Sequence, residues 1–102
     1  MADNIGLTDI EMQKLVSVLS STRNIEKAIV YGSRAKRTNR KYSDVDLTLV
    51  GDNLTHHDLN KVEMEIDDLL LPYEFDISLY SSLKNKEIIE HINRVGKVIY
   101  ES

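Results

Sequence analysis

The 102-residue sequence predicts a single domain (residues 1–102) of the α/β (α+β) class, with a small mixed sheet of three to four strands flanked by helices. Three observations lead to this prediction. Apolar residues recur at helical spacing in three segments, and short segments between them alternate between polar and apolar residues. A chain of this length has room for one hydrophobic core only. Glycine occurs four times and proline once, which is too rare for a disordered or collagen-like chain.

The first predicted elements are a helix and a strand. Thr8 and Glu11 have the spacing of a capping box, in which each side chain bonds to the backbone N–H of the other residue, so a helix is expected from here to about Ser21. Residues 25–31 are apolar and rich in β-branched side chains, which predicts a strand that stops at Gly32.

The second half of the chain alternates strands and helices. Residues 44–50 and 74–80 alternate polar with apolar side chains and predict two strands. Between them a helix is expected from Thr55 until Pro72 ends it, and its apolar face comprises Leu59, Val62, Ile66, Leu69 and Leu70. A helix that connects two strands in this way favours a parallel pair. The strands at 25–31 and 44–50, joined through a loop, are expected to be antiparallel.

Two further elements complete the predicted fold. Residues 84–95 carry apolar side chains at helical spacing, with Ile88, Ile92 and Val95 on one stripe. Residues 98–100 are apolar and predict a short fourth strand at an edge of the sheet.

Strand alternation predicts where the carboxylates lie. In the second strand Asp44 and Asp46 point away from the apolar, core-facing side chains, and in the third strand Glu74 and Asp76 do the same. If these strands are neighbours, Asp44, Asp46 and Asp76 converge on one patch. Glu74 is the alternative to Asp76 as the third member.

Crowded carboxylates indicate a cation site. Each like-charged neighbour raises the free energy of ionising a carboxyl group, and a divalent cation relieves that repulsion. Mg²⁺ binds through a few carboxylates together with substrate phosphates. The patch is therefore interpreted as one half of a magnesium–nucleotide site.

The second half of this site is predicted at Gly32 and Ser33. Glycine lets the backbone approach a phosphate closely, and the Ser33 hydroxyl and the N–H groups of a turn can bind phosphate oxygens. Five of the eight residues 34–41 are basic. They are Arg34, Lys36, Arg37, Arg40 and Lys41. Arg34 is the first choice for a forked phosphate contact.

Charge and composition exclude several classes of protein. The net charge is −4, with +2 in residues 1–51 and −6 in residues 52–102, so one compact basic loop stands in an acidic chain. This arrangement disfavours nucleic-acid binding, which needs a broad basic face, and suits a small polyanion. The chain has no cysteine and begins without a signal-like segment. Its longest aliphatic run, residues 69–71, is too short for a membrane span, so a cytoplasmic protein is expected.

The three histidines, His56, His57 and His91, are interpreted as surface residues because no third ligand stands at metal-binding spacing.

The site residues resemble a known signature. Gly32-Ser33, ten intervening residues and Asp44-Val45-Asp46 resemble the motif of the MNT minimal nucleotidyltransferases of the DNA polymerase β superfamily, whose order of elements the chain also follows. The resemblance implies a nucleotidyltransferase fold, two Mg²⁺ ions on Asp44, Asp46 and Asp76, and binding of the ATP triphosphate by Gly32 and Ser33. Asp76 would be the general base. Arg37 stands where the family often has glycine.

The resemblance also implies a partner. MNT proteins are commonly paired, as antitoxins, with HEPN RNase toxins, and they add AMP from ATP to a toxin tyrosine. Only 26 residues follow Asp76, so we expect the acceptor site to be supplied by the partner. Two alternatives remain open: a nucleotidyltransferase acting on a small-molecule hydroxyl, and a non-catalytic antitoxin that neutralises its partner by binding.

Overall fold

The computed structural model describes residues 5–32, 34 and 44–102. Its helices are α1 (Asp9–Ser21), α2 (His56–Asp67) and α3 (Lys86–Val95), with a short 3₁₀ turn, η1 (Tyr80–Ser82). Its strands are β1 (Lys27–Tyr31), β2 (Val45–Val50), β3 (Phe75–Leu79) and β4 (Lys97–Glu101). They form one sheet in the order β3-β2-β1-β4. β1 is antiparallel to β2 and β4, and β2 is parallel to β3, so the predicted mixed sheet is confirmed. The strand predicted at residues 98–100 is β4, and it lies at one edge of the sheet, as expected.

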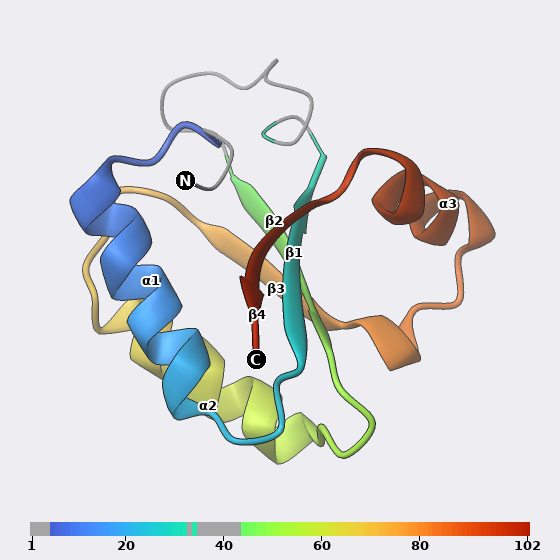
Figure 1. Ribbon diagram of the computed structural model, residues 1–102, viewed down its shortest axis with the longest axis horizontal. Helices are drawn as coiled ribbons and strands as arrows, with labels where there is room; N and C mark the ends of the chain where they lie inside the picture. The colour runs from blue at the N-terminus through green and yellow to red at the C-terminus, as the bar shows by residue number, and fades with distance from the viewer. Residues whose placement is uncertain (1–4, 33, 35–43) are drawn as a thin grey trace.

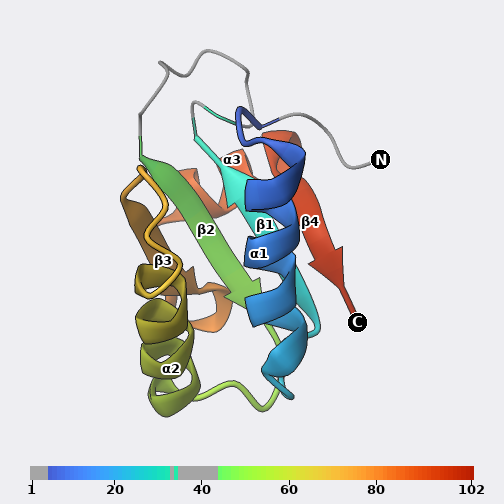
Figure 2. The ribbon, with the colours of Figure 1, turned by 90° about the vertical axis from the view of Figure 1, so that its left-hand side faces the viewer.

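The helices cover the two faces of the sheet unequally. α1 and α2 lie side by side on one face, and α3 lies on the other (Figure 1). The view turned by 90° shows α1 and α2 in front of the strands and α3 behind them (Figure 2). One face is therefore sealed by two helices, and the other is covered in part by one.

The hydrophobic core lies between the sheet and the α1–α2 layer. The alternate residues Val45, Leu47 and Leu49 of β2 are almost fully buried there, against Leu15 and Val62 of the two helices. Since successive side chains of a strand point to opposite faces, Asp46 projects from the face that carries α3. The predicted assignment of β2 side chains to a core face and a polar face is confirmed.

α1 and α2 begin at the predicted residues, α3 begins at Lys86, two residues later than predicted, and α2 ends earlier than predicted. Thr8 forms the predicted capping box with Glu11, and Thr55 forms a second one with Asp58. α2 ends at Asp67, earlier than Pro72 alone indicates. Leu70 follows in a left-handed conformation (φ 56°) and is 88% exposed, so its predicted place on the apolar face of α2 is wrong.

Most of the predicted phosphate loop lies outside the described residues. This holds for Ser33, for the helical turn expected at 34–37 except Arg34 itself, and for the other four basic residues, which are Lys36, Arg37, Arg40 and Lys41. In the part of the chain that the structure describes, no helix has both the length and the apolar character needed to cross a bilayer.

Candidate functional site

The candidate site lies where three strands end at the same edge of the sheet. β1 runs antiparallel to β2, and β2 runs parallel to β3, so the C-terminal end of β1 meets the N-terminal ends of β2 and β3. Tyr31 is paired with Asp46, and Asp46 is paired with Asp76. These three residues form a row across the sheet and share one face, because residues in register on neighbouring strands point the same way.

The row brings two of the predicted carboxylates together. Neighbouring strands are about 4.8 Å apart, so the Asp46 and Asp76 backbones are one strand spacing apart. Asp44 lies just before β2 and is exposed. Glu74 precedes β3, and its carbonyl accepts the N–H of Val45, which helps set the β2–β3 register.

Asp46 lies in an unfavourable electrostatic environment. Partial burial raises its pKa, and the neighbouring charges of Asp76 and then Asp44 raise it further. The carboxylates that act on Asp46 are thus Asp76 and Asp44. This electrostatic contact favours Asp76 over Glu74 as the third member of the patch.

The donor chemistry at this edge fits Mg²⁺. Carboxylate oxygens are the ligands that this hard cation prefers, and a cation would relieve the repulsion that raises the pKa of Asp46. Within residues 5–32, 34 and 44–102, no three acidic, histidine or cysteine side chains already stand close enough together to hold an ion. Strand pairing sets the Asp46 and Asp76 backbones side by side, and both Asp76 and Asp44 are exposed, so side-chain rotation would have to bring the three carboxylates around an ion.

Gly32 lies directly against the Asp46 carboxylate. Its φ is +77°, a left-handed conformation that side chains disfavour. A Cβ atom built on Gly32 would collide with Asp46 Oδ2. The backbone conformation therefore requires glycine here, and Gly32 lies directly against the Asp46 carboxylate.

Arg34 is buried and makes contacts within the protein. Its side chain is 1% exposed. One guanidinium nitrogen donates to the Ile5 carbonyl at 2.8 Å, and the group stacks over the Tyr73 ring, 4.7 Å from the ring centroid. Burial lowers its pKa, while Tyr73, Glu11 and Asp44 act in the opposite direction. These contacts fit a structural role for Arg34, and its phosphate contact stays a prediction.

Tyr31 contributes a partly buried phenol to the site face. Burial raises its pKa, and the charges of Asp46 and Asp76 act in the same direction, whereas a hydrogen bond with Ser78 lowers it. Ser78 in turn donates to the Thr48 hydroxyl at 3.1 Å. The phenol is therefore held neutral beside the two carboxylates, in a polar layer that crosses β1, β2 and β3.

His91 is the residue that the sequence analysis missed. It was interpreted as a surface residue, and this is wrong, because its half-buried Nε2 accepts the Gly32 N–H at 2.9 Å. The signal was present in the sequence. His91 falls at helical spacing within the stripe of Ile88, Ile92 and Val95, so it had to face the sheet. His56 and His57 are exposed, as interpreted.

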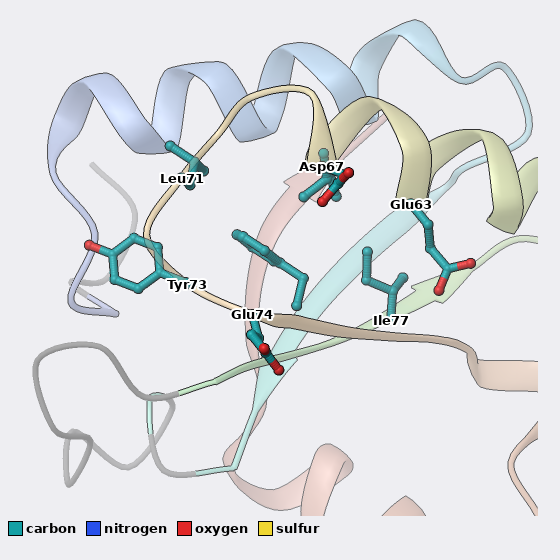
Figure 3. A pocket seen from close by; sticks show the side chains of 8 residues that line it. Glu63, Asp67, Leu71, Tyr73, Glu74 and Ile77 are labelled. Atoms are coloured by element: carbon teal, nitrogen blue, oxygen red, sulfur yellow. The ribbon is translucent and has the colours of Figure 1, made fainter.

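A separate pocket lies away from this site. It has a volume of about 300 Å³ and opens between α2 and the segment leading into β3, with Glu63, Asp67 and Tyr73 on its rim (Figure 3). Ile77 contributes to its wall from the core side of β3. Since Asp76 points to the opposite face of the same strand, the pocket is not part of the acidic row.

Comparison with known proteins decides the family. The family model described as "Polymerase beta, Nucleotidyltransferase" matches residues 13–102. The chain belongs to this nucleotidyltransferase family. The match includes Gly32, Asp44, Asp46 and Asp76. No curated protein matches the sequence closely.

Solved structures of this fold include toxin–antitoxin complexes. A crystal structure of a toxin–antitoxin pair with AMP-PNP contains a chain with a TM-score of 0.72 and 15% identity, over 89% of this nucleotidyltransferase and 73% of that chain. A complex of the tri-AMPylated HEPN toxin of Shewanella oneidensis with its MNT antitoxin gives 0.68 and 12%, over 94% and 74%. The MntA–HepT toxin–antitoxin structure gives 0.67 and 12%, over 93% and 74%. At these identities the likeness establishes the nucleotidyltransferase fold.

Proposed function

We propose that this protein transfers AMP from ATP to a hydroxyl group, namely a tyrosine of a cognate HEPN RNase toxin, and thereby acts as an antitoxin. The observation that carries the proposal is the register of Asp46 with Asp76 beneath the Gly32 turn. Two similar folds support the choice of substrate and partner. One was crystallised with AMP-PNP, and the other is an MNT antitoxin bound to an AMPylated HEPN toxin.

In this proposal the side chains have separate roles. Asp44, Asp46 and Asp76 would hold Mg²⁺, two ions in the expected arrangement, and the metal would supply charge neutralisation at the phosphates and acidify the acceptor hydroxyl. Gly32 and Ser33 bind the triphosphate. The acceptor oxygen bonds to the α-phosphorus as the bond to pyrophosphate breaks, and Asp76 takes the hydroxyl proton.

The decisive experiment is coexpression of the chain with its toxin, followed by intact mass measurement of both proteins. The toxin should gain the mass of one or more AMP groups when ATP and Mg²⁺ are present. The double variant Asp44→Asn/Asp46→Asn should lower the transfer rate by at least about 100-fold, because it removes the ligands that concentrate positive charge at the phosphates. Glu63→Gln, an exposed carboxylate change on α2, is the matched control and should leave the rate unchanged.

Two outcomes would contradict the proposal. A toxin that gains no mass, yet is still neutralised by the double variant, would make the protein an antitoxin that acts by binding alone. Transfer near the wild-type rate in the double variant would remove the carboxylates from the mechanism. A comparison of Asp76→Asn with Glu74→Gln decides which of these is the third carboxylate, and we expect loss of transfer only in the first.

A further inference from the structure

The contact between α3 and the Gly32 turn deepens the proposed function, on which this inference rests. We propose that His91 is a positioning residue, which holds the Gly32 turn against Asp46 in the form that binds the nucleotide. His91 acts through Gly32.

The imidazole is fixed by two contacts. Its Nε2 accepts the Gly32 N–H at 2.9 Å, so the ring is neutral in this state and carries its proton on Nδ1. The ring also meets the Tyr31 ring edge to face, with centroids 6.2 Å apart and planes at 76°. Because Nε2 is already engaged, His91 serves the turn in this structure and leaves metal binding to the carboxylates.

The helix that carries His91 is seated firmly on the sheet. Asn85 caps its N-terminus by accepting two backbone N–H groups, and Ile92, the next residue after His91, is 2% exposed. At the other end a Cβ atom on Gly96 would collide with the Ile29 side chain of β1, so helix and strand approach closely. Asn93 accepts a hydrogen bond from the Tyr80 hydroxyl at 3.2 Å. His91 is thus presented from a rigid element, as a positioning group requires.

The consequence falls on the Gly32 peptide. The Gly32 N–H that donates to His91 is partly buried. Removal of the His91 imidazole would therefore leave this donor without a hydrogen-bond acceptor. Gly32 is also the residue whose backbone is freest to rotate, and its position above Asp46 Oδ2 depends on a φ of +77°. His91 compensates for that freedom. Since the Gly32 N–H donates to His91, Gly32 contributes to triphosphate binding by letting the phosphate approach the backbone closely.

The test compares four variants with the wild-type chain. His91→Leu removes the acceptor but keeps an apolar side chain toward the sheet. His91→Gln places an amide oxygen near the position of Nε2 and should restore the bond, and His91→Asn has an oxygen that is too short to reach. Asn93→Ala breaks the Tyr80 contact on the same helix and controls for general loosening of α3.

Two measurements are made on each isolated chain. Amide hydrogen exchange at Gly32, read by NMR without nucleotide, should be at least roughly tenfold faster in His91→Leu and His91→Asn than in wild type. The Kd for AMP-PNP with Mg²⁺, measured by calorimetry, should rise roughly fivefold in the same two variants, the scale of one hydrogen bond. His91→Gln and Asn93→Ala should stay within about threefold of wild type in both measurements.

The outcomes separate this inference from the proposed function. Unchanged Gly32 exchange and unchanged Kd in folded His91→Leu or His91→Asn overturn the role of His91. The same losses in Asn93→Ala also overturn it, because they would show that any weakening of α3 suffices. If the wild-type chain binds no AMP-PNP, the nucleotide role of both the site and His91 is refuted, and the exchange data still decide whether His91 holds the turn.

Discussion

Asp46 is held in an unfavourable electrostatic environment, and this has a measurable effect on stability. Burial and the charges of Asp76 and Asp44 raise its pKa in the folded protein above that of the unfolded chain. The folded state is therefore destabilised once Asp46 ionises, and the penalty is fully present at pH values above the folded pKa. Asp46→Asn should raise the Tm at pH 7 without metal by about 2–6 °C, the usual scale for relieving strain at a functional site.

The pH dependence gives this prediction its sign. The advantage of Asp46→Asn should shrink as the pH falls through the folded and then the unfolded pKa, and it should vanish where Asp46 is protonated in both states. Thermal unfolding followed by circular dichroism from pH 3 to 8 measures it. Glu63→Gln, on the opposite side of the sheet, should show no such trend. A lower Tm for Asp46→Asn at pH 7 would contradict the stated origin of the shift.

Single residues differ in how far the sequence could predict them. Asp46 and Asp76 were predictable because strand alternation alone decides the face on which they lie. The requirement for glycine at position 32 was predictable in kind, but its contact with Asp46 depends on the β1–β2 register. The contacts of His91 with Gly32 and of Arg34 with Ile5 were not predicted, because each joins residues from different elements. Local patterns carry no information about such partners.

Among the helices, α1 was predicted at both ends, whereas the end of α2 and the start of α3 were not. The capping boxes at Thr8 and Thr55 use side chains that are close in sequence, so their spacing identifies them. The end of α2 is set by a change of backbone conformation at Leu70, a residue type that rarely adopts a positive φ. A leucine gives no sequence signal for such a turn, and helical periodicity alone predicted that the apolar face of α2 extends to Leu70.

Leu70 therefore offers a test at the level of this element. Its left-handed backbone is strained for a β-carbon-bearing residue, and its side chain is 88% exposed, so little burial is lost on its removal. Leu70→Gly should increase the free energy of unfolding by about 0.5–1 kcal/mol, since glycine adopts this conformation without strain. Urea denaturation measures the change.

Leu69→Gly is the matched comparison. Leu69 is partly buried and packs against the core, so the same replacement one residue earlier should destabilise the protein by about 2 kcal/mol or more. If Leu70→Gly also lowers the free energy of unfolding, the prediction is contradicted, because contacts of the exposed Leu70 side chain would then outweigh its backbone strain.

For the molecule as a whole, the pairing of the strands decides whether the carboxylates predicted on separate strands come together. The helix between β2 and β3 favoured a parallel pair, and that pair places Asp76 beside Asp46. The sequence also predicted three to four strands, but not which helix covers the site face. That choice depends on α3 crossing to the face opposite α1 and α2 (Figure 2), and it is what brings His91 to the turn.

Arg34 ties the edge of the site to the rest of the molecule. It donates to the Ile5 carbonyl and stacks on Tyr73, whose hydroxyl donates to Glu11 at 2.9 Å. Glu11 also accepts the Thr8 N–H in the capping box of α1. Arg34 is thus linked to the N-terminal segment and α1 on one side and to the loop before β3 on the other, two parts of the chain that are far apart in sequence.

The two roles considered for Arg34 make opposite predictions. If the buried guanidinium is structural, Arg34→Met should lower the stability of the nucleotide-free chain by about 2–3 kcal/mol, or roughly 10 °C in Tm, because the Ile5 carbonyl and the Tyr73 face lose a buried cation. Arg23→Met, at an exposed arginine, should change the Tm little. If Arg34 instead binds phosphate, Arg34→Met should leave the nucleotide-free Tm unchanged and weaken AMP-PNP binding by calorimetry. The 1% exposure of Arg34 favours the first result, since a fully buried cation can reach a phosphate only after these contacts are broken.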